Sequence, residues 1–423
     1  MSFRNIAPAG APIRAGDLAR ATAIAVSPAN VSERLRTVIN ERFGVRHSVL
    51  TSTGRAGMTL LLRALRRLAP GGRNEVIVPS YTCYSVAASA VKAGLRPRIV
   101  DISPRTLDYA PGELANTDFS RVLAIVATNL YGLPNNLPDV CHIARQHGVF
   151  VIDDAAQSMG ASIGGRWSGT WGNAGLFSLD KGKPVSAIDG GIVVTNSDEV
   201  AAALDAEMAG MASPGLDRGG IDVLKALAYF VFLRPWLYGI PQRLPQLELG
   251  KTVFSTDYPL ESPTRPLVAL GLSAVEHLGE YTRIRVANAT ALLERLKTMP
   301  GVQAITPIAG AVPAYLRAPI LICDGHARRR AFDALRAEGI GATGSYPASL
   351  VDVSELRPHL ADPVPRAVGG RYVADHIVTL PTHPFVSAGD IERTLTVVAA
   401  SVDRAAVTPA HGGHQEPSAV CAE

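Results

Sequence analysis

The sequence predicts an α/β fold in which a mostly parallel central sheet is covered by helices and is followed by a smaller α+β unit. In the first half, short apolar runs alternate with stretches of helical period. These runs do not alternate apolar with polar residues, which is typical of strands buried on both faces of a parallel sheet. Near residue 269 long helical patterns take over, so we expect a large domain over residues 1–268 and a smaller one over 269–405.

The apolar runs of the first half have the length and composition of strands, and helical stretches lie between them. The last of these helices has Pro138 in its first turn and Gly148 just past its end, as helices prefer. The expected strands are Glu75–Val78, Arg98–Asp101, Val122–Ala127, Val149–Asp153, Gly175–Leu179 and Gly191–Thr195. The expected helices are Ala56–Leu68, Ser85–Ala93 and Asp139–Gln146.

The second half begins with the pattern of one long helix. Shorter strand-like and helical pieces follow, and a tail rich in Pro, Gly and His ends the chain. We expect this tail, residues 406–423, to be disordered. The expected elements are a helix over Leu270–Met299, a strand over Tyr315–Ile322, a helix over Ala327–Glu338, a strand near His376–Leu380 and a last helix over Ala388–Ala405.

Composition argues against several classes of protein. Hydrophobic residues make up 47% of the chain and charged residues 18%, so it can bury a large core. The net charge of +4 is small, and the basic run Arg63–Arg67 fits a solvated helix face, so we expect no nucleic-acid partner. The four cysteines lack disulfide or metal-ligand spacing, which predicts no metal site and suits a reducing cytoplasm. The N-terminus lacks the apolar segment of a signal peptide, so we expect a cytoplasmic location.

Residues 205–265 form an atypical apolar insertion at the end of the expected large domain. The run AYFVFL lies within Lys225–Arg243, where Arg234, Pro235 and Gly239 break the apolar pattern and make it too short to span a bilayer. A core or subunit-contact helix is the favoured interpretation. The alternative is contact with a membrane surface. Such contact would use Phe230, Phe232, Trp236 and Tyr238.

Two acids and two lysines are the first candidates for catalysis. Asp153 and Asp154 lie where an expected strand ends, and ligands of open parallel sheets bind beyond the carboxyl ends of strands. Taken alone, the pair fits a helix cap or a turn equally well. Lys183 follows the next strand, with Lys181 as its rival, and the spacing does not decide between them. An acid that holds a protonated ring nitrogen and a lysine that forms an imine are what pyridoxal phosphate (PLP) chemistry needs.

The turn Gly54-Arg55-Ala56 is a candidate phosphate site. It follows Thr51-Ser52-Thr53 and opens a helix, where free N–H groups and the helix dipole attract a phosphate. An ordinary N-cap is the simpler interpretation when the turn is taken alone. Ser178, beside the lysine loop, offers a hydroxyl to the same phosphate, and Gln157 offers a hydrogen bond to a phenolic oxygen beside the imine. The remaining candidates, which stack on a ring or simply pack in a helix, are Tyr81, Cys83 and Tyr84.

In this order along the chain, these motifs resemble the DegT/StrS-type family of PLP-dependent sugar aminotransferases. The resemblance covers roughly residues 42–398 and implies the fold-type I, aspartate aminotransferase-like architecture. The IDDAAQ and FSxxxxK blocks are its most specific parts. The matching segments are TSTGRAGMTLLLRAL (51–65), VPSYTCYSVAASAVKAGLRPRIVDI (78–102), NLYGLPNNL (129–137), HGVFVIDDAAQSMGA (147–161), WGNAGLFSLDKGK (171–183), GGIVVTN (190–196) and LPTHP (380–384).

The resemblance implies a role for each candidate. Asp154 matches the acid that pairs with the pyridine nitrogen, and Lys183, not Lys181, matches the Schiff-base lysine. Gln157 matches the residue near the phenolic oxygen of PLP. The ring-stacking position falls on Cys83, with Tyr84 as the alternative. The phosphate contacts match Ser178, Gly54, Arg55 and Ala56.

The chain departs from the family pattern at several positions. Arg55 stands where the family usually has threonine, and Pro184 stands where asparagine is common. The family's Asn-Tyr-Arg block, whose asparagine reaches phosphate from the neighbouring protomer, is not found before Gly271, where the sequence reads YPLESPTRPLVALG. His383 and Tyr346 lie in matching blocks, and both lining of the substrate mouth and plain packing remain open for them.

The function implied is transfer of an amino group from an amino acid, by resemblance glutamate, to a keto-sugar. The sugar is expected to be nucleotide-linked and destined for polysaccharide or glycoconjugate, and the enzyme is expected to be a homodimer with active sites at the subunit boundary. One alternative is a catalytically impaired PLP-binding regulator or scaffold. Another is a different PLP reaction, such as sugar dehydration. Lys183 argues against dehydration, because histidine replaces this lysine in the sugar dehydratases.

Overall fold

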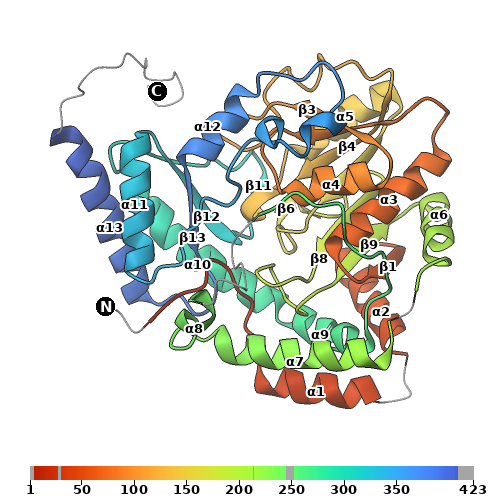
Figure 1. Cartoon of the computed structure of the whole chain (residues 1–423), viewed down its shortest axis with the longest axis horizontal. Helices are drawn as coiled ribbons and strands as arrows, with labels where there is room; N and C mark the ends of the chain where they lie inside the picture. The colour runs from red at the N-terminus through yellow and green to blue at the C-terminus, as the bar shows by residue number, and fades with distance from the viewer. Residues whose placement is uncertain (1–3, 27–29, 213, 244–251, 408–423) are drawn as a thin grey trace.

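The computed structural model describes residues 4–26, 30–212, 214–243 and 252–407, and Figure 1 shows its arrangement. Its main feature is a seven-stranded sheet with the order β1-β9-β8-β5-β4-β2-β3. The neighbours from β3 through β8 pair in parallel, whereas β9 is antiparallel to both β8 and β1, so the predicted α/β class is confirmed. The strands are β1 (His47–Thr51), β2 (Glu75–Pro79), β3 (Arg96–Val100), β4 (Val122–Thr128), β5 (Phe150–Asp154), β8 (Ala174–Ser178) and β9 (Gly191–Thr195).

Helices cover both faces of this sheet. Val76 and Ile152 pack on the side of α3 and α4, whereas their neighbours Ile77 and Val151 pack on the side of α5. Burial on both faces is why these strands carry uninterrupted apolar runs. The helices of this part are α2 (Val31–Phe43), α3 (Gly54–Leu68), α4 (Tyr84–Lys92), α5 (Leu137–His147) and α6 (Asp198–Met208).

The predicted long helix over Leu270–Met299 is wrong, because the structure has two helices there. α9 (Arg265–Glu276) and α10 (Leu278–Leu296) are separated at His277. The His277 backbone has φ −85° and ψ −5°, close to helical, so the apolar period continues across the break and hides it from the sequence pattern. The His277 ring lies 2.9 Å from the carboxylate of Asp17, which belongs to α1 (Ala15–Val26).

The C-terminal part has its own antiparallel sheet, in the order β10-β12-β13. Buried residues of this sheet and of the helices beside it form a separate hydrophobic cluster. However, Leu350 and Leu356 belong to the cluster of the large sheet, and Leu350 N–H donates to the Ser80 carbonyl. The domain boundary near residue 269 therefore stays a prediction. The elements are β10 (Val302–Ala304), β12 (Arg317–Ile322), α11 (Gly325–Ala337), α12 (Val368–His376), β13 (Ile377–Pro381) and α13 (Ala388–Val407).

Smaller elements complete the described chain. A second three-stranded sheet has the order β11-β6-β7. Within its described residues the apolar insertion includes α7 and α8, and α7 packs against α1 and α9. The described residues contain no helix with the length and apolar character needed to cross a membrane. The tail expected to be disordered lies almost wholly outside the described residues. The elements are β6 (Ser162–Ile163), β7 (Arg166–Trp167), β11 (Ala311–Val312), α7 (Leu216–Phe232) and α8 (Gly239–Gln242).

The N-terminal segment is tied to the C-terminal half by hydrogen bonds. Ile6 N–H donates to the Gly339 carbonyl at 2.7 Å. The next carbonyl, of Ala7, lies 2.9 Å from Nε2 of His383, which donates because a carbonyl can only accept. His383 is fully buried, which lowers the pKa of its imidazole to about 4. This packing role agrees with one of the two interpretations that the sequence left open.

We expect His383 to make stability depend on pH. Its folded-state pKa lies below the usual 6.5, so as pH falls the unfolded chain binds this proton first. The free energy of unfolding is unaffected by this proton above pH 6.5. As pH falls from 6.5 toward 4, that free energy decreases, by about 3 kcal/mol at most. Urea unfolding of wild type and His383→Gln across this range measures the difference between them. Exposed His142→Gln is the control, and equal slopes for wild type and His383→Gln would contradict the prediction.

Candidate active site

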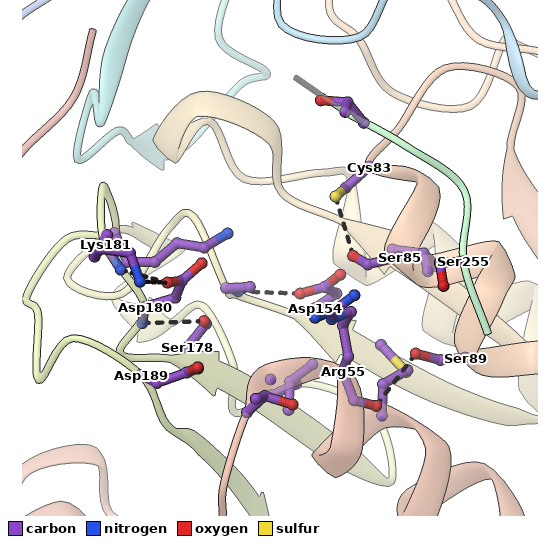
Figure 2. A pocket seen from close by; sticks show the side chains of 18 of the residues that line it. Arg55, Cys83, Ser85, Ser89, Asp154, Ser178, Asp180, Lys181, Asp189 and Ser255 are labelled. Carbon is purple, nitrogen blue, oxygen red and sulfur yellow. Dashed lines mark hydrogen bonds and ion pairs between the residues drawn. The ribbon is translucent and has the colours of Figure 1, made fainter. Parts of the chain in front are cut away.

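A cavity of about 640 Å³ lies beyond the carboxyl ends of β5 and β8, beside the first turn of α3. Figure 2 shows Asp154 between the loop that carries Asp180 and Lys181 and the start of α4 beside Cys83. The lining residues are Thr53, Gly54, Arg55, Met58, Cys83, Ser85, Val86, Ser89, Asp154, Ala156, Leu176, Ser178, Asp180, Lys181, Lys183, Asp189, Thr252, Val253 and Ser255. The predicted site residues that the cavity brings together are Gly54, Arg55, Cys83, Asp154, Ser178 and Lys183.

The two adjacent aspartates have different surroundings, because successive residues of a strand point to opposite faces. Asp153 is fully buried, and its carboxylate accepts hydrogen bonds from the Asn129 amide and from the N–H groups of Gly169 and Trp171. It holds the loop before β8. Asp154 instead lines the cavity, with one carboxylate oxygen accepting the Ala156 N–H at 3.0 Å. Asp154 is thus the member of the pair that faces a ligand.

Burial and charge act in opposite directions on Asp154. Burial raises the pKa of its carboxyl, whereas the hydrogen bond from Ala156 and the positive charge of Lys183 lower that pKa. A cationic group placed in the cavity would lower it further, since an opposite charge favours the ionised carboxylate. The surroundings of Asp154 therefore favour a positively charged partner.

The first turn of α3 presents N–H groups to the cavity. Thr53 is the N-cap, and its hydroxyl accepts the Ala56 N–H at 3.0 Å. The preceding N–H groups, of Gly54 and Arg55, have no acceptor within an α-helix. A Cβ atom added at Gly54 would lie 3.1 Å from Oγ of Ser178, so the serine hydroxyl lies beside this turn. The turn and Ser178 can bind one phosphate together, with the Ala56 N–H committed to the cap.

The lysine loop, residues 179–190, connects β8 to β9, and its two lysines lie in different environments. Lys181 is exposed, and its ammonium lies 3.7 Å from Asp180 and donates to the Ile188 carbonyl. Lys183 is partly buried, lines the cavity and interacts electrostatically with the Asp154 carboxylate. This arrangement agrees with the role that the resemblance implies for Lys183.

Arg285 holds the lysine loop and was missed by the sequence analysis. Its guanidinium is buried on α10 and donates to the carbonyls of Pro184 at 2.7 Å, Gly10 at 3.0 Å and Lys183 at 3.5 Å. Burial lowers the pKa of Arg285 to about 10. In the described chain no carboxylate lies within ion-pairing distance of it, so backbone carbonyls are its partners. A lone arginine in a helical pattern gives no sign of this role in the sequence.

The structure places the remaining predicted residues beside the cavity or outside its lining. Cys83 lines the cavity, and its sulfur accepts a hydrogen bond from the Ser85 hydroxyl. Tyr84 is not part of the lining, and its hydroxyl bonds the backbone of Ala348. The stacking role of Tyr84 therefore stays a prediction without support from this arrangement.

Gln157 is also outside the cavity lining. Its side-chain amide donates to the Tyr346 hydroxyl at 2.8 Å, and its oxygen accepts the N–H of Tyr131 at 3.0 Å. These bonds place Tyr346 in a packed cluster, where it is 8% exposed. The contact of Gln157 with the phenolic oxygen of PLP stays a prediction, and Tyr346 has the packing role that the sequence left open.

Further features of the cavity had no sequence signal. Asp180 and Asp189 face it from the lysine loop, and burial, followed by the charge of Asp180, raises the pKa of Asp189 to about 6. Thr252, Val253 and Ser255 form one wall. This wall comes from the apolar insertion, so the insertion is part of the site.

The model of the DegT/DnrJ/EryC1/StrS aminotransferase family matches residues 23–225, which contain all the predicted site residues. This match spans just under half of the chain and supports the resemblance to this family. Among curated relatives, a UDP-N-acetyl-3-dehydro-α-D-glucosamine 3-aminotransferase of Acidithiobacillus ferrooxidans is 37% identical over 158 residues, and a GDP-perosamine synthase of Caulobacter vibrioides is 35% identical over 159 residues. These matches cover 37% and 38% of this chain. They span only 42% of the length of each relative.

Solved structures of aminotransferases extend the likeness to nearly the whole chain. TlmJ of Streptoalloteichus hindustanus has a TM-score of 0.76 at 22% identity, covering 96% of this chain and 100% of its own. PseC of Helicobacter pylori, involved in the biosynthesis of pseudoaminic acid, has a TM-score of 0.77 at 16% identity, with coverage of 95% and 100%. These likenesses confirm the aspartate aminotransferase-like fold that the family resemblance implied.

We expect Arg285→Met to loosen the lysine loop. The substitution keeps an apolar stem but leaves three backbone carbonyls without their shared donor, so the loop opens more often. Hydrogen exchange of the amides of residues 181–188 should quicken roughly tenfold for each 1.4 kcal/mol of opening free energy lost. Arg283→Met, at an exposed position on the same helix, is the control. Unchanged exchange in Arg285→Met would show that the guanidinium does not hold the loop.

Proposed function

We propose that this protein is a PLP-dependent aminotransferase that moves an amino group from an amino acid, with glutamate as the donor, to a keto-sugar. The observation that carries the proposal is one cavity lined by Asp154, Lys183, Ser178 and the first turn of α3. These groups offer a carboxylate to a cationic ring nitrogen, an amine to an aldehyde and hydrogen-bond donors to a phosphate. A ring nitrogen, an aldehyde and a phosphate are the three groups that PLP carries.

The residues present fit PLP in size and in chemistry. A cavity of about 640 Å³ is within the usual range for small-molecule sites, roughly 300–1,000 Å³. Among the described residues the Asp154 side chain accepts a single hydrogen bond, from Ala156, so it retains capacity for a ring N–H. A side chain at position 54 would collide with Ser178. Because Gly54 has none, the space beside the phosphate turn stays open.

The mechanism assigns a distinct task to each side chain. Bound PLP supplies an electron sink that stabilises negative charge on the substrate carbon. The buried Asp154 carboxylate holds the proton on the ring nitrogen, where exclusion of water strengthens the attraction. The Nζ atom of Lys183 would hold the cofactor through its aldehyde and, when free, would take up and return the substrate proton as a general base. Arg285 fixes the loop from which that amine acts.

The proposed acceptor is a nucleotide-linked keto-sugar used for polysaccharide or glycoconjugate. The relatives named above carry UDP- or GDP-sugar compounds in their names, which supports this class. An L-glutamine:2-deoxy-scyllo-inosose aminotransferase of Streptoalloteichus tenebrarius, 34% identical over 158 residues, covers 37% of both chains and makes glutamine the donor to test against glutamate. We further propose a homodimer in the cytoplasm, with sites at the subunit boundary, as the family resemblance implies.

Two relatives motivate tests of the two alternatives, sugar dehydration and a regulatory role. A GDP-4-keto-6-deoxy-D-mannose 3-dehydratase of Yersinia pseudotuberculosis is 31% identical over 163 residues, and a pleiotropic regulatory protein of Geobacillus stearothermophilus is 36% identical over 139 residues. They cover 38% and 33% of this chain, and the matches span 42% and 37% of those relatives. Lys183 supports amino transfer over dehydration.

Glutamate should convert the PLP-loaded protein to its amino form, which is followed by its absorption spectrum. Keto-sugar nucleotides should then restore the starting spectrum.

We expect Lys183→Ala to lose covalent attachment of the cofactor. Borohydride reduction followed by peptide mapping should place the label on Lys183 in wild type and find none on the variant, because only an imine is trapped. Transaminase activity should fall below detection. Lys181→Ala is the matched control and should keep label and activity. A label that persists in Lys183→Ala but disappears in Lys181→Ala would sink the assignment.

We expect Asp154→Asn to keep PLP but to lose roughly 10²–10³-fold in turnover, the cost of removing one preorganised electrostatic partner. The neutral amide no longer favours a protonated ring nitrogen, so the visible spectrum of the bound cofactor should change as well. Asp153→Asn is the matched control. It should lower the free energy of unfolding while leaving that spectrum unchanged, because its carboxylate bonds the loop at Gly169. Near-normal turnover in Asp154→Asn would contradict the role.

A further inference from the structure

Helix α7 is apolar on two opposite sides. Its inner side packs into the core through Ala226, which is 5% exposed. Leu233, just after the helix, is also 5% exposed and lies beside Gly10. On its outer side Ile221 is 48% exposed and Leu224 is 66% exposed. A helix on a protein surface ordinarily carries polar residues on the face that points away from the core. One side of α7 is therefore open in the described chain although its composition calls for a cover.

Further exposed apolar residues follow α7 in the chain. Trp236 is 67% exposed and Ile240, on α8, is 50% exposed. In Figure 1, α7 lies near the bottom of the view, directly above α1. We call these residues the outer apolar face: Ile221, Leu224, Leu227, Val231, Phe232, Trp236 and Ile240. Exposed apolar residues gathered in one place mark a binding surface, whereas scattered ones do not.

Positive charge accompanies the outer apolar face. Within residues 214–243, Asp217 is the one exposed acid, whereas Asp222 is buried and accepts hydrogen bonds from Thr264 and, at 3.3 Å, from the Lys225 ammonium. The guanidinium of Arg234 lies 4.9 Å from the centre of the Phe230 ring, so cation and apolar surface are adjacent. The exposed cations of this segment are Arg218, Lys225, Arg234 and Arg243. The occupant of the face is therefore expected to combine apolar material with negative charge.

We propose that the outer apolar face binds the surface of an anionic lipid bilayer. Lipid offers acyl chains to Leu224 and Trp236 and anionic headgroups to the flanking arginines, as for helices that lie in the membrane interface. A second copy of the chain fits less well. A two-fold interface brings the same patch from both copies together, so two positively charged patches would meet. The proposal holds whatever reaction the cavity performs.

Vesicle sedimentation of the PLP-loaded protein tests the proposal. The protein should pellet with phosphatidylglycerol–phosphatidylcholine vesicles at low salt, and far less with phosphatidylcholine alone. High salt should weaken the binding without abolishing it, because apolar contact is not screened. A protein that stays in the supernatant with both lipids at low salt would overturn the proposal.

Variants locate the contact. The triple variant Leu224→Ser, Val231→Ser, Trp236→Ser should lose binding at least about tenfold. Each of Arg218→Gln and Arg234→Gln should lose about fivefold on anionic vesicles alone. Val368→Ser is the control, because Val368 is 68% exposed on α12, away from this face. Vesicle binding unchanged in the triple variant, with conversion of a dimer to monomers in sedimentation velocity, would assign the face to subunit contact instead.

Tryptophan fluorescence gives a readout that does not depend on the triple variant folding. Lipids brominated in their acyl chains should quench wild-type fluorescence on binding, since Trp236 would reach the acyl boundary. Trp236→Phe should bind but lose this quenching, whereas Trp167→Phe, at a residue on β7, should retain it. Equal quenching in wild type and Trp236→Phe would overturn the placement of the face.

Discussion

The parallel pairing of β5 with β8 is the constraint on which the site depends. In this pair Asp154 lies opposite Leu176, so β8 reaches Ser178 at the same edge of the sheet where β5 ends. The antiparallel strand β9 then brings β1 alongside, and β1 delivers the first turn of α3 to that edge. A Cβ atom at Gly191 would lie 2.5 Å from Thr51 Oγ1, so β9 can pass this turn only with glycine there.

The alternation of a β-strand explains why an adjacent acid pair serves two purposes. Asp153 is turned toward the loop at Gly169 and Trp171, where it fixes backbone N–H groups. Asp154, one residue later, faces the cavity from the end of the same strand. A rigid neighbour at 153 restrains the backbone that presents the carboxylate at 154, because both lie on one buried strand. The cavity is thus built on regular structure on this side and on a loop on the lysine side.

The sequence pattern predicted the elements that depend on a local apolar period. It failed for the features that contacts between distant residues determine. The parallel strands were predictable because burial on both faces leaves an apolar run, but β1, with His47 and Ser48 at its start, has too short a run to be recognised. The helix break at His277 left the period intact. Lys181 and Lys183 have the same local context, and only the family resemblance separated them. Arg285 bonds a loop about a hundred residues away in sequence, so no local pattern points to it.

The apolar insertion and the departure from the family at position 55 have a common explanation. Tyr258, at the end of the insertion, places its hydroxyl 2.7 Å from Thr59 on α3, and its ring centre lies 4.8 Å from the Arg55 guanidinium. Threonine at position 55 could not make this cation–π contact. Arg55 therefore helps to bind the returning chain to α3, and the residues just before Tyr258 become the cavity wall at Thr252–Ser255. One insertion supplies both the outer apolar face and a wall of the site, which makes the two surfaces neighbours along the chain rather than independent additions.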